Sequence, residues 1–405
     1  MFAGVGVQRS MRRILIDAQP GEIRAAVLAD GTLIDLLIER ADRPNPVGGR
    51  YLGRVVAFDD SLQAAFVDIG LDRPGLLPRK NAMSRLSDGD RAVVRVVRPP
   101  APGKGVKLKQ DIPDPDETAG RVPRQLSAPL PLADFIARHA PADIRVAGEV
   151  AMARLQRQAP RFAATATAER LDADPFYALG LDTAIDALLS PMVTLSNGGR
   201  LWIEPVRTLT AVDVDTGEQA QRTGVSGLSP AAANRAAIAE IVRQTQLRAL
   251  SGLIVVDFLE VETKQVRTEI AEALASAFAN DPVRTDVGPM RASGLVEISR
   301  ERVRPPLHEV LLEPCGRSGS GYVARADTAA RWALRALARE ALARPGTCLG
   351  LRVAPAVAAA LADSVRPARE ALGQRLGYAP PVLADSHLER EAWEITEAAD
   401  AERQA

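Results

Sequence analysis

Two aspartates, Asp213 and Asp257, stand at the ends of the aliphatic runs LTAVD and GLIVVD. Such runs predict core strands, whose ends aim side chains from a rigid base into a crevice. A helix predicted between them lets the second strand return alongside the first, so the two acids could meet. Paired carboxylates without a nearby histidine suit Mg²⁺, which binds through one or two carboxylates and keeps water. The pair therefore predicts metal-assisted phosphoryl transfer.

The competing interpretation of these aspartates is structural. Strand-end aspartates often cap turns or helices, and one motif alone does not separate the two roles. The aliphatic neighbours favour the metal site, because an unpaired carboxylate among buried residues is costly. Histidine is scarce, with only His139, His308 and His387 in the chain, so carboxylates are better candidates for catalysis than an imidazole.

The elements that must position the acids form an α/β pattern between residues 191 and 312. The strands GRLWIEPV and TLTAVDVD precede a long helix, SPAAANRAAIAEIVRQTQLRAL; the strand LIVVDFLEV, a helix around TEIAEALASAFAND and the strand LVEISRER follow. Upstream, residues 12–38 predict three short strands. The stretch 47–110 predicts five compact strands with glycine at the corners, as in a small antiparallel barrel. Residues 99–131 are rich in proline and predict a linker or mobile loop.

Composition bounds the remaining classes. A chain of 405 residues is long enough for two to four domains. Its formal net charge is zero, but residues 39–109 contain 14 Lys or Arg against 8 Asp or Glu, which indicates a basic module. Two cysteines exclude a disulfide framework. With no apolar run long enough for a signal or a membrane span, we expect a cytoplasmic protein without a membrane partner.

The ordered motifs LTAVDVDTG, NRAAIAEIVRQTQLRALSG, LIVVDFLEV and GLVEISRER resemble the catalytic core of the ribonuclease E/G family of single-strand-specific endoribonucleases. Upstream, YLGRVVAFDDSLQAAFVDIGLDRPGLLPRK resembles the OB-fold domain of that family, of the class named after ribosomal protein S-one. The likeness spans residues 12 to about 323 and is weakest from 110 to 180. It implies a multidomain α/β fold: a ribonuclease H-like and deoxyribonuclease I-like core, an inserted OB-fold β-barrel and a small C-terminal α/β domain.

The resemblance also implies domain boundaries and site residues. Asp213 and Asp257 match the aspartates that hold the catalytic Mg²⁺, and Asp215 stands where the family usually has asparagine, so the rate is in doubt. Phe66 matches an aromatic that stacks on an RNA base, whereas a second aromatic is replaced by Leu76. The other RNA-binding candidates are Lys104, Arg54, Arg73, Arg79, Lys80, Arg300 and Arg302. The expected domains are 12–46 (N-terminal strands of the ribonuclease H-like domain), 47–110 (OB-fold), 111–190 (linker and the rest of that domain), 191–312 (catalytic domain), 313–321 (zinc-link turn) and 322–405 (small C-terminal domain).

Each RNA-binding candidate also has a plainer interpretation. Phe66 could be a residue of the barrel core, although its alternation with Ala64 and Asp68 favours the polar face. The basic side chains could simply be solvated, and Arg300 and Arg302 could be ordinary surface arginines.

Two departures limit what the resemblance implies. In EPCGRSGSG, Pro314 and Arg317 occupy the positions of the family's two zinc-binding cysteines, and Cys315 falls between them. A lone thiolate cannot build a four-ligand zinc site, so we expect no zinc and no zinc-linked dimer; a homodimer without a zinc link stays open. The segment before LDADPFYALGL is shorter than usual and lacks the RTAG-like motif that reads a 5′ monophosphate. We expect little preference for that end.

Together with the paired acids, the resemblance implies a Mg²⁺-dependent endoribonuclease that cleaves single-stranded RNA in ribosomal RNA processing or messenger decay. The alternative is a catalytically weak RNA-binding or ribosome-assembly factor with the same fold. A DNA nuclease is a third, less favoured interpretation.

Overall fold

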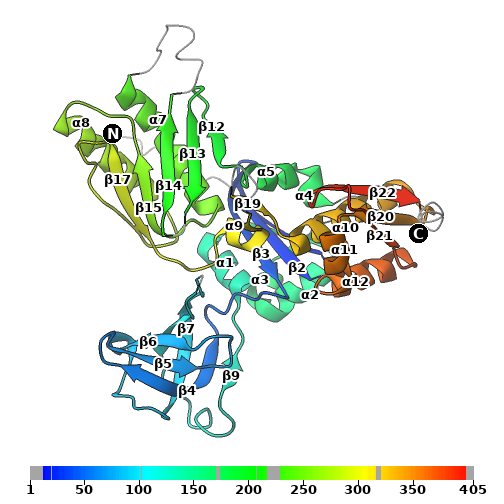
Figure 1. Ribbon diagram of the computed structural model, residues 1–405, viewed down its shortest axis with the longest axis horizontal. Coiled ribbons are helices and arrows are strands. Elements are labelled where there is room, and N and C mark those ends of the chain that lie inside the picture. The colour runs from blue at the N-terminus through cyan, green and yellow to red at the C-terminus, as the bar shows by residue number, and fades with distance from the viewer. Residues whose placement is uncertain are drawn as a thin grey trace, which may run out of the picture.

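The computed structural model describes residues 12–19, 21–101, 103–169, 174–206, 208–216, 229–315 and 321–397. They form a central α/β unit, a separate barrel, a second α/β unit with a six-stranded sheet and a small C-terminal domain (Figure 1). The residues 217 and 316–320 of the predicted motifs lie outside the described part.

The central unit is a five-stranded sheet with helices on both faces. Its aliphatic strands are buried on both sides, which is why β2 reads as a nearly continuous apolar run. One face packs against α1 and α2 and the other against α4, α5 and α9. In sheet order the strands are β11 (Thr167–Glu169), β10 (Asp143–Ala147), β1 (Arg12–Gln19), β2 (Glu22–Ala29) and β3 (Thr32–Arg40). The helices are α1 (Pro131–His139), α2 (Gly148–Gln158), α3 (Pro160–Ala163), α4 (Pro175–Ala178), α5 (Leu181–Ala187) and α9 (Leu307–Leu311).

The barrel is a separate module inserted after β3. Five strands close on themselves through the pairing of β4 with β5, a topology consistent with the predicted OB-fold. The strands are β4 (Arg50–Asp59), β5 (Ala64–Asp68), β6 (Gly75–Pro78), β7 (Arg91–Arg98) and β8 (Lys107–Gln110), with the 3-10 helix η1 (Arg79–Asn81).

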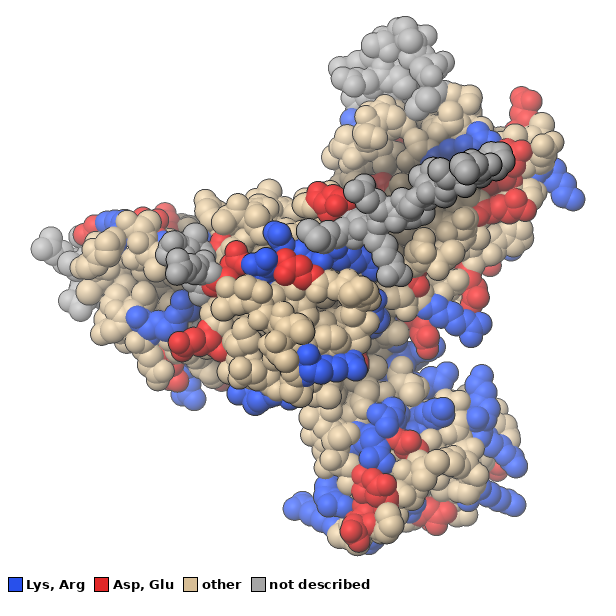
Figure 2. Space-filling model, turned by 180° about the vertical axis from the view of Figure 1, so that it is seen from behind, with Lys and Arg blue, Asp and Glu red and all other residues tan. Residues whose placement is uncertain are grey.

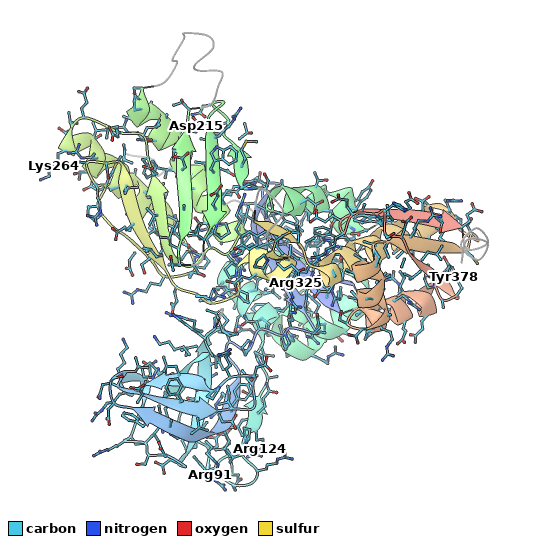
Figure 3. The ribbon with its side chains drawn as sticks, in the orientation of Figure 1. Arg91, Arg124, Asp215, Lys264, Arg325 and Tyr378 are labelled. Carbon is cyan, nitrogen blue, oxygen red and sulfur yellow. The ribbon has the colours of Figure 1, made fainter. Side chains whose placement is uncertain are left out.

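Residues 111–127 belong to the barrel, in contrast to the linker predicted there. Strand β9 (Arg124–Ser127) pairs with β4, and Arg50 forms ion pairs with Asp111 and Glu117. Arg91 and Arg124, labelled in Figure 3, donate hydrogen bonds to backbone carbonyls between residues 117 and 120. Composition alone suggested mobility because it does not register these ion pairs.

The second α/β unit carries its helices on one face of the sheet. The buried side chains of its strands pack against α7 (Pro230–Leu247) and α8 (Lys264–Phe278). Ser229 and Thr263 cap the two helices through their side-chain oxygens. In sheet order the strands are β12 (Met192–Thr194), β13 (Arg200–Pro205), β14 (Thr210–Asp215), β15 (Gly252–Asp257), β17 (Leu295–Arg300) and β16 (Thr285–Val287).

The C-terminal domain packs Ala-rich helices on a three-stranded sheet with its own core. Arg335 and Arg339 of α10 form ion pairs with Glu22 of β2 and Asp182 of α5, which attach this domain to the central unit. Its elements are β18 (Leu312–Pro314), β19 (Tyr322–Ala324), α10 (Ala326–Ala343), β20 (Leu349–Val353), α11 (Pro355–Ala362), α12 (Arg366–Leu376), β21 (Val382–Ala384) and β22 (Trp393–Glu397). No helix in the described part of the chain is long and apolar enough to cross a membrane.

Candidate active site

Asp213 and Asp257 are neighbours on adjacent strands. Strands β14 and β15 run parallel, and their register sets Asp213 directly beside Asp257. Neighbouring strands lie about 4.8 Å apart, so the two carboxylates share one small area of the sheet. The predicted convergence of the two acids is confirmed at the level of strand register.

Alternation along the strands decides which way the acids face. Val212 and Val214 are buried against the helices, whereas Asp213 is exposed on the opposite face. The same alternation buries Val256 and exposes Asp257. The neighbouring valines fill the core, as expected for β-branched residues of these runs, and the carboxylates point to the uncovered face, where solvent moderates their repulsion.

The surroundings of Asp213 change its pKa. Partial burial, followed by the negative charges of Asp257 and Asp215, raises the pKa of Asp213 above its ordinary value. A raised pKa beside a second carboxylate is what a cation would relieve, so this donor set fits a hard divalent ion.

Asp215 lies two residues further along β14, on the same face and at the end of the strand (Figure 3). The register places Arg200 of β13 opposite it. In the described part of the chain no three His, Cys, Asp or Glu side chains are arranged to hold a metal ion together. A site built on Asp213 and Asp257 would thus have two protein carboxylates, leaving room for water and substrate phosphate.

Two residues that the sequence analysis did not single out hold the turn after β15. Asn234 is fully buried in α7; its amide donates to the Leu259 carbonyl at 2.8 Å and accepts from the Leu259 amide at 3.0 Å. Gly294 has φ +89°, and a Cβ there would lie 2.2 Å from the carbonyl oxygen of Phe258. Both constrain the residues that follow Asp257. An asparagine that follows the alanines near the start of this helix was the only sequence signal for the first of them.

The barrel places most of the predicted RNA-binding residues on its surface. Phe66 is half-buried on β5 and pairs across the strands with Leu76, also half-buried. Figure 2 shows Lys and Arg side chains spread over the visible face of this module. The exposed basic candidates are Arg54, Arg73, Arg79, Lys80 and Lys104.

Two predicted RNA contacts have structural roles instead. The Arg300 side chain is 4% exposed and makes a bidentate ion pair with the buried Asp281, at 2.7 and 3.1 Å. Arg302 pairs with Glu309 and donates to the carbonyl of Pro100, which joins this segment to the end of the barrel region. The expectation of a backbone contact is wrong for Arg300, because strand alternation turns it inward, and Arg302 is mostly enclosed by its partners.

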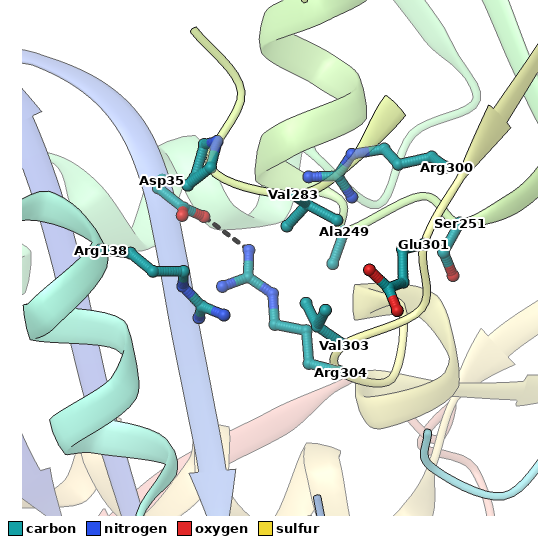
Figure 4. Close-up of a pocket in the computed structure, with 10 residues that line it drawn as sticks. Asp35, Arg138, Ala249, Ser251, Val283, Arg300, Glu301, Val303 and Arg304 are labelled. Carbon is teal, nitrogen blue, oxygen red and sulfur yellow. Dashed lines mark hydrogen bonds and ion pairs between the residues drawn. The ribbon is translucent and has the colours of Figure 1, made fainter. Parts of the chain in front are cut away.

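A small basic pocket lies between the central unit and the segment after β17 (Figure 4). Arg304 donates to Asp35 at 2.5 Å, and Asp35 also pairs with His139 Nε2 at 2.8 Å. Burial would raise the pKa of Asp35, but Arg304 and the His139 hydrogen bond hold it well below its usual range. Because these charges satisfy one another, we interpret the pocket as a clamp between the two α/β units.

Comparisons with known proteins cover the residues of this site. The model of the ribonuclease E/G family matches residues 132–303, which include both aspartates and the helix between them. Ribonuclease G of Haemophilus influenzae is 25% identical over 80% of this chain and 87% of its own length. Ribonuclease G of Escherichia coli strain K12 is also 25% identical, over 86% of this chain and 92% of its own.

The chain is similar to the ribonuclease E/G family over these residues. A shorter stretch, 36% of the chain, is 32% identical to ribonuclease E of a Nostoc species. The family match ends at residue 303, so it covers the six-stranded sheet and leaves the C-terminal domain outside. The barrel also lies before the matched residues, although the two ribonuclease G relatives align over most of the chain.

Proposed function

We propose that this chain is a member of the ribonuclease E/G family, an endoribonuclease that cleaves single-stranded RNA with a Mg²⁺ ion held by Asp213 and Asp257. The observation that carries the proposal is the register that sets these two residues side by side on an uncovered sheet face. Similarity to the ribonuclease E/G family model and to relatives named ribonuclease G supports an enzyme acting on RNA.

The residues of the chain have distinct tasks in this proposal. Asp213 and Asp257 hold the ion, and Asn234 and Gly294 fix the turn that follows Asp257. When bound, the ion supplies positive charge for the phosphoryl oxygens and makes a water a stronger nucleophile. Asp215 adds a third negative charge on the same face, which strengthens cation binding but repels the phosphate.

The barrel is the substrate-holding module. Phe66 offers one stacking surface and the exposed basic side chains can follow a phosphate backbone without reading sequence. We assign the two α/β units to the ribonuclease H-like and deoxyribonuclease I-like folds of the family. We further propose that the enzyme acts in the cytoplasm on ribosomal RNA precursors or messenger RNA and enters the strand internally. It needs no zinc-linked dimer, because Pro314 replaces one expected cysteine and Cys315 is a single thiol.

Cleavage of a single-stranded oligonucleotide, with and without Mg²⁺, tests the proposal. Substrates with a 5′ triphosphate and a 5′ monophosphate should both be cut at comparable rates. Asp213→Asn and Asp257→Asn should each abolish cleavage with little loss of RNA binding. Glu204→Gln is the matched control, since Glu204 is an exposed acid on the same sheet face, and it should cleave normally.

The third carboxylate favours a second candidate function. Asp215 beside Asp213 concentrates negative charge where the family usually has an amide, which would weaken phosphate binding at the site. RNA binding without Mg²⁺-dependent product from either oligonucleotide would identify the chain as an RNA-binding or ribosome-assembly factor. Recovery of cleavage in Asp215→Asn would then locate the cause.

A further inference from the structure

Trp202 stands directly beside the proposed metal pair. Strand β13 runs antiparallel to β14, and their register sets Trp202 opposite Asp213. A continuous row of residues therefore crosses the sheet in the order Met192, Trp202, Asp213, Asp257 and Leu295. The indole lies one strand away from the carboxylate that would bind the ion.

The side chain of Trp202 lies on the uncovered face. Its neighbours Leu201 and Ile203 are buried against the helices, whereas Trp202 remains 37% exposed. Met192, the next residue in the row, is 38% exposed on the edge strand. A tryptophan buries 150–250 Å² when it finds a partner, so an exposed indole beside carboxylates leaves much apolar surface uncovered.

We infer that Trp202 is a stacking platform for a base of the RNA strand next to the scissile phosphodiester. The inference rests on the proposed function, because the metal pair is what brings a phosphate to this face. A phosphate held at Asp213 and Asp257 leaves the attached nucleoside within one strand spacing of the indole. Stacking accepts any base, since every base has a π-face, and it requires that the base be unpaired.

Trp202 also supplies a second aromatic surface, which the strand pair of the barrel lacks. Leu76 gives the barrel only one aromatic surface, Phe66, on that pair of strands. A second stacking site placed at the metal pair would hold the strand at the point of reaction. It would make the enzyme demand an unpaired nucleotide there and leave the sequence unspecified.

Cleavage of oligonucleotides that carry one abasic site, moved along the strand, tests the inference. Wild-type enzyme should lose about 5- to 150-fold in kcat/KM when the base nearest the cut is missing, the value of one stacked base. Trp202→Leu should cleave the intact strand slower by a similar factor and show no further loss at that abasic position. Trp202→Phe should restore the dependence, which a merely structural role would not produce.

Leu253→Ala is the control, because Leu253 is an exposed apolar residue on the same face of β15, away from the acids. It should keep the wild-type abasic profile. An unchanged profile in Trp202→Leu, with cleavage intact, would overturn the platform and leave the nuclease assignment standing.

A fluorescence measurement separates failure of the platform from failure of the nuclease. Single-stranded RNA should quench the tryptophan emission of the wild-type chain more than that of Trp202→Phe, and the difference should vanish with a fully abasic strand. That difference without any cleavage would support the platform and reject the nuclease. An equal signal from both proteins would reject the platform, whatever the cleavage assay shows.

Discussion

Asp213 and Asp257 occupy the same register position on two hydrogen-bonded parallel strands, where partial burial and then the neighbouring negative charges raise the pKa of Asp213. Like charges placed side by side lower the stability of the fold, and a bound cation would offset that loss. The testable consequences concern this pair, the turn after Asp257, the barrel that we propose binds RNA and the clamp between the two α/β units.

Metal and pH should act on stability through Asp213. Because its pKa is raised in the folded state, stability of the metal-free protein falls as pH rises from the ordinary value of about 3.9 through the raised value. At neutral pH, Asp213→Asn should therefore melt at a higher temperature than wild type without metal. Mg²⁺ should raise the melting temperature of wild type and of Glu204→Gln, and have little effect on Asp213→Asn. Equal stabilisation of all three by Mg²⁺ would argue against the site.

Gly294→Ala should lower the cleavage rate, because it displaces the backbone next to Asp257. Its new Cβ would meet the Phe258 carbonyl oxygen at 2.2 Å, so the turn after Asp257 must move. A displacement of about 1 Å at a catalytic group can cost about 100-fold in rate. Gly252→Ala is the control: Gly252 has φ +82° and open space around it, so it should lose only about 1–2 kcal/mol of stability. Comparable kcat values for the two variants would contradict this role of Gly294.

The affinity of the barrel for single-stranded RNA should depend on its aromatic residues. Phe66→Ala should weaken binding of single-stranded RNA by about 1–3 kcal/mol, the value of one stacked base. Leu76→Phe should tighten it, because the new ring would lie next to Phe66 across the strand pair. Filter binding of a short oligonucleotide measures both, with the exposed Leu62→Ala as a control in the same module. Unaltered affinity in Phe66→Ala would assign that ring to the barrel core.

The clamp between the two α/β units should control the stability of the protein at acid pH. Asp35→Asn leaves Arg304 without its buried partner and should lower the free energy of unfolding by about 3–5 kcal/mol. Because the pKa of Asp35 is depressed, its contribution is present above about pH 3.9 and is lost as pH falls towards the folded-state value. Urea unfolding at several pH values measures this contribution. The exposed pair Arg284–Asp286 is the control, and Asp286→Asn should change stability by less than about 1 kcal/mol.

The sequence by itself determined much of the local architecture. Aliphatic runs specified β14 and β15, short strands separated by glycine specified the barrel, and ordered motifs indicated the family. These features are local, because burial of alternate side chains and turn chemistry act within a few residues. The convergence of Asp213 and Asp257 was also within reach, since a helix between two strands returns the second beside the first.

Only the tertiary structure decided which way the side chains face and which partners they meet. Alternation turned Arg300 into the core to pair with Asp281, left Asp213 exposed, and set Trp202 beside it. Residues 111–127 pack on the barrel through ion pairs to Arg50. Arg304 pairs with Asp35, which is distant from it in the sequence. The spacing of residues in the sequence does not predict such pairings, because strand register and long-range charge contacts form only when separate elements pack together.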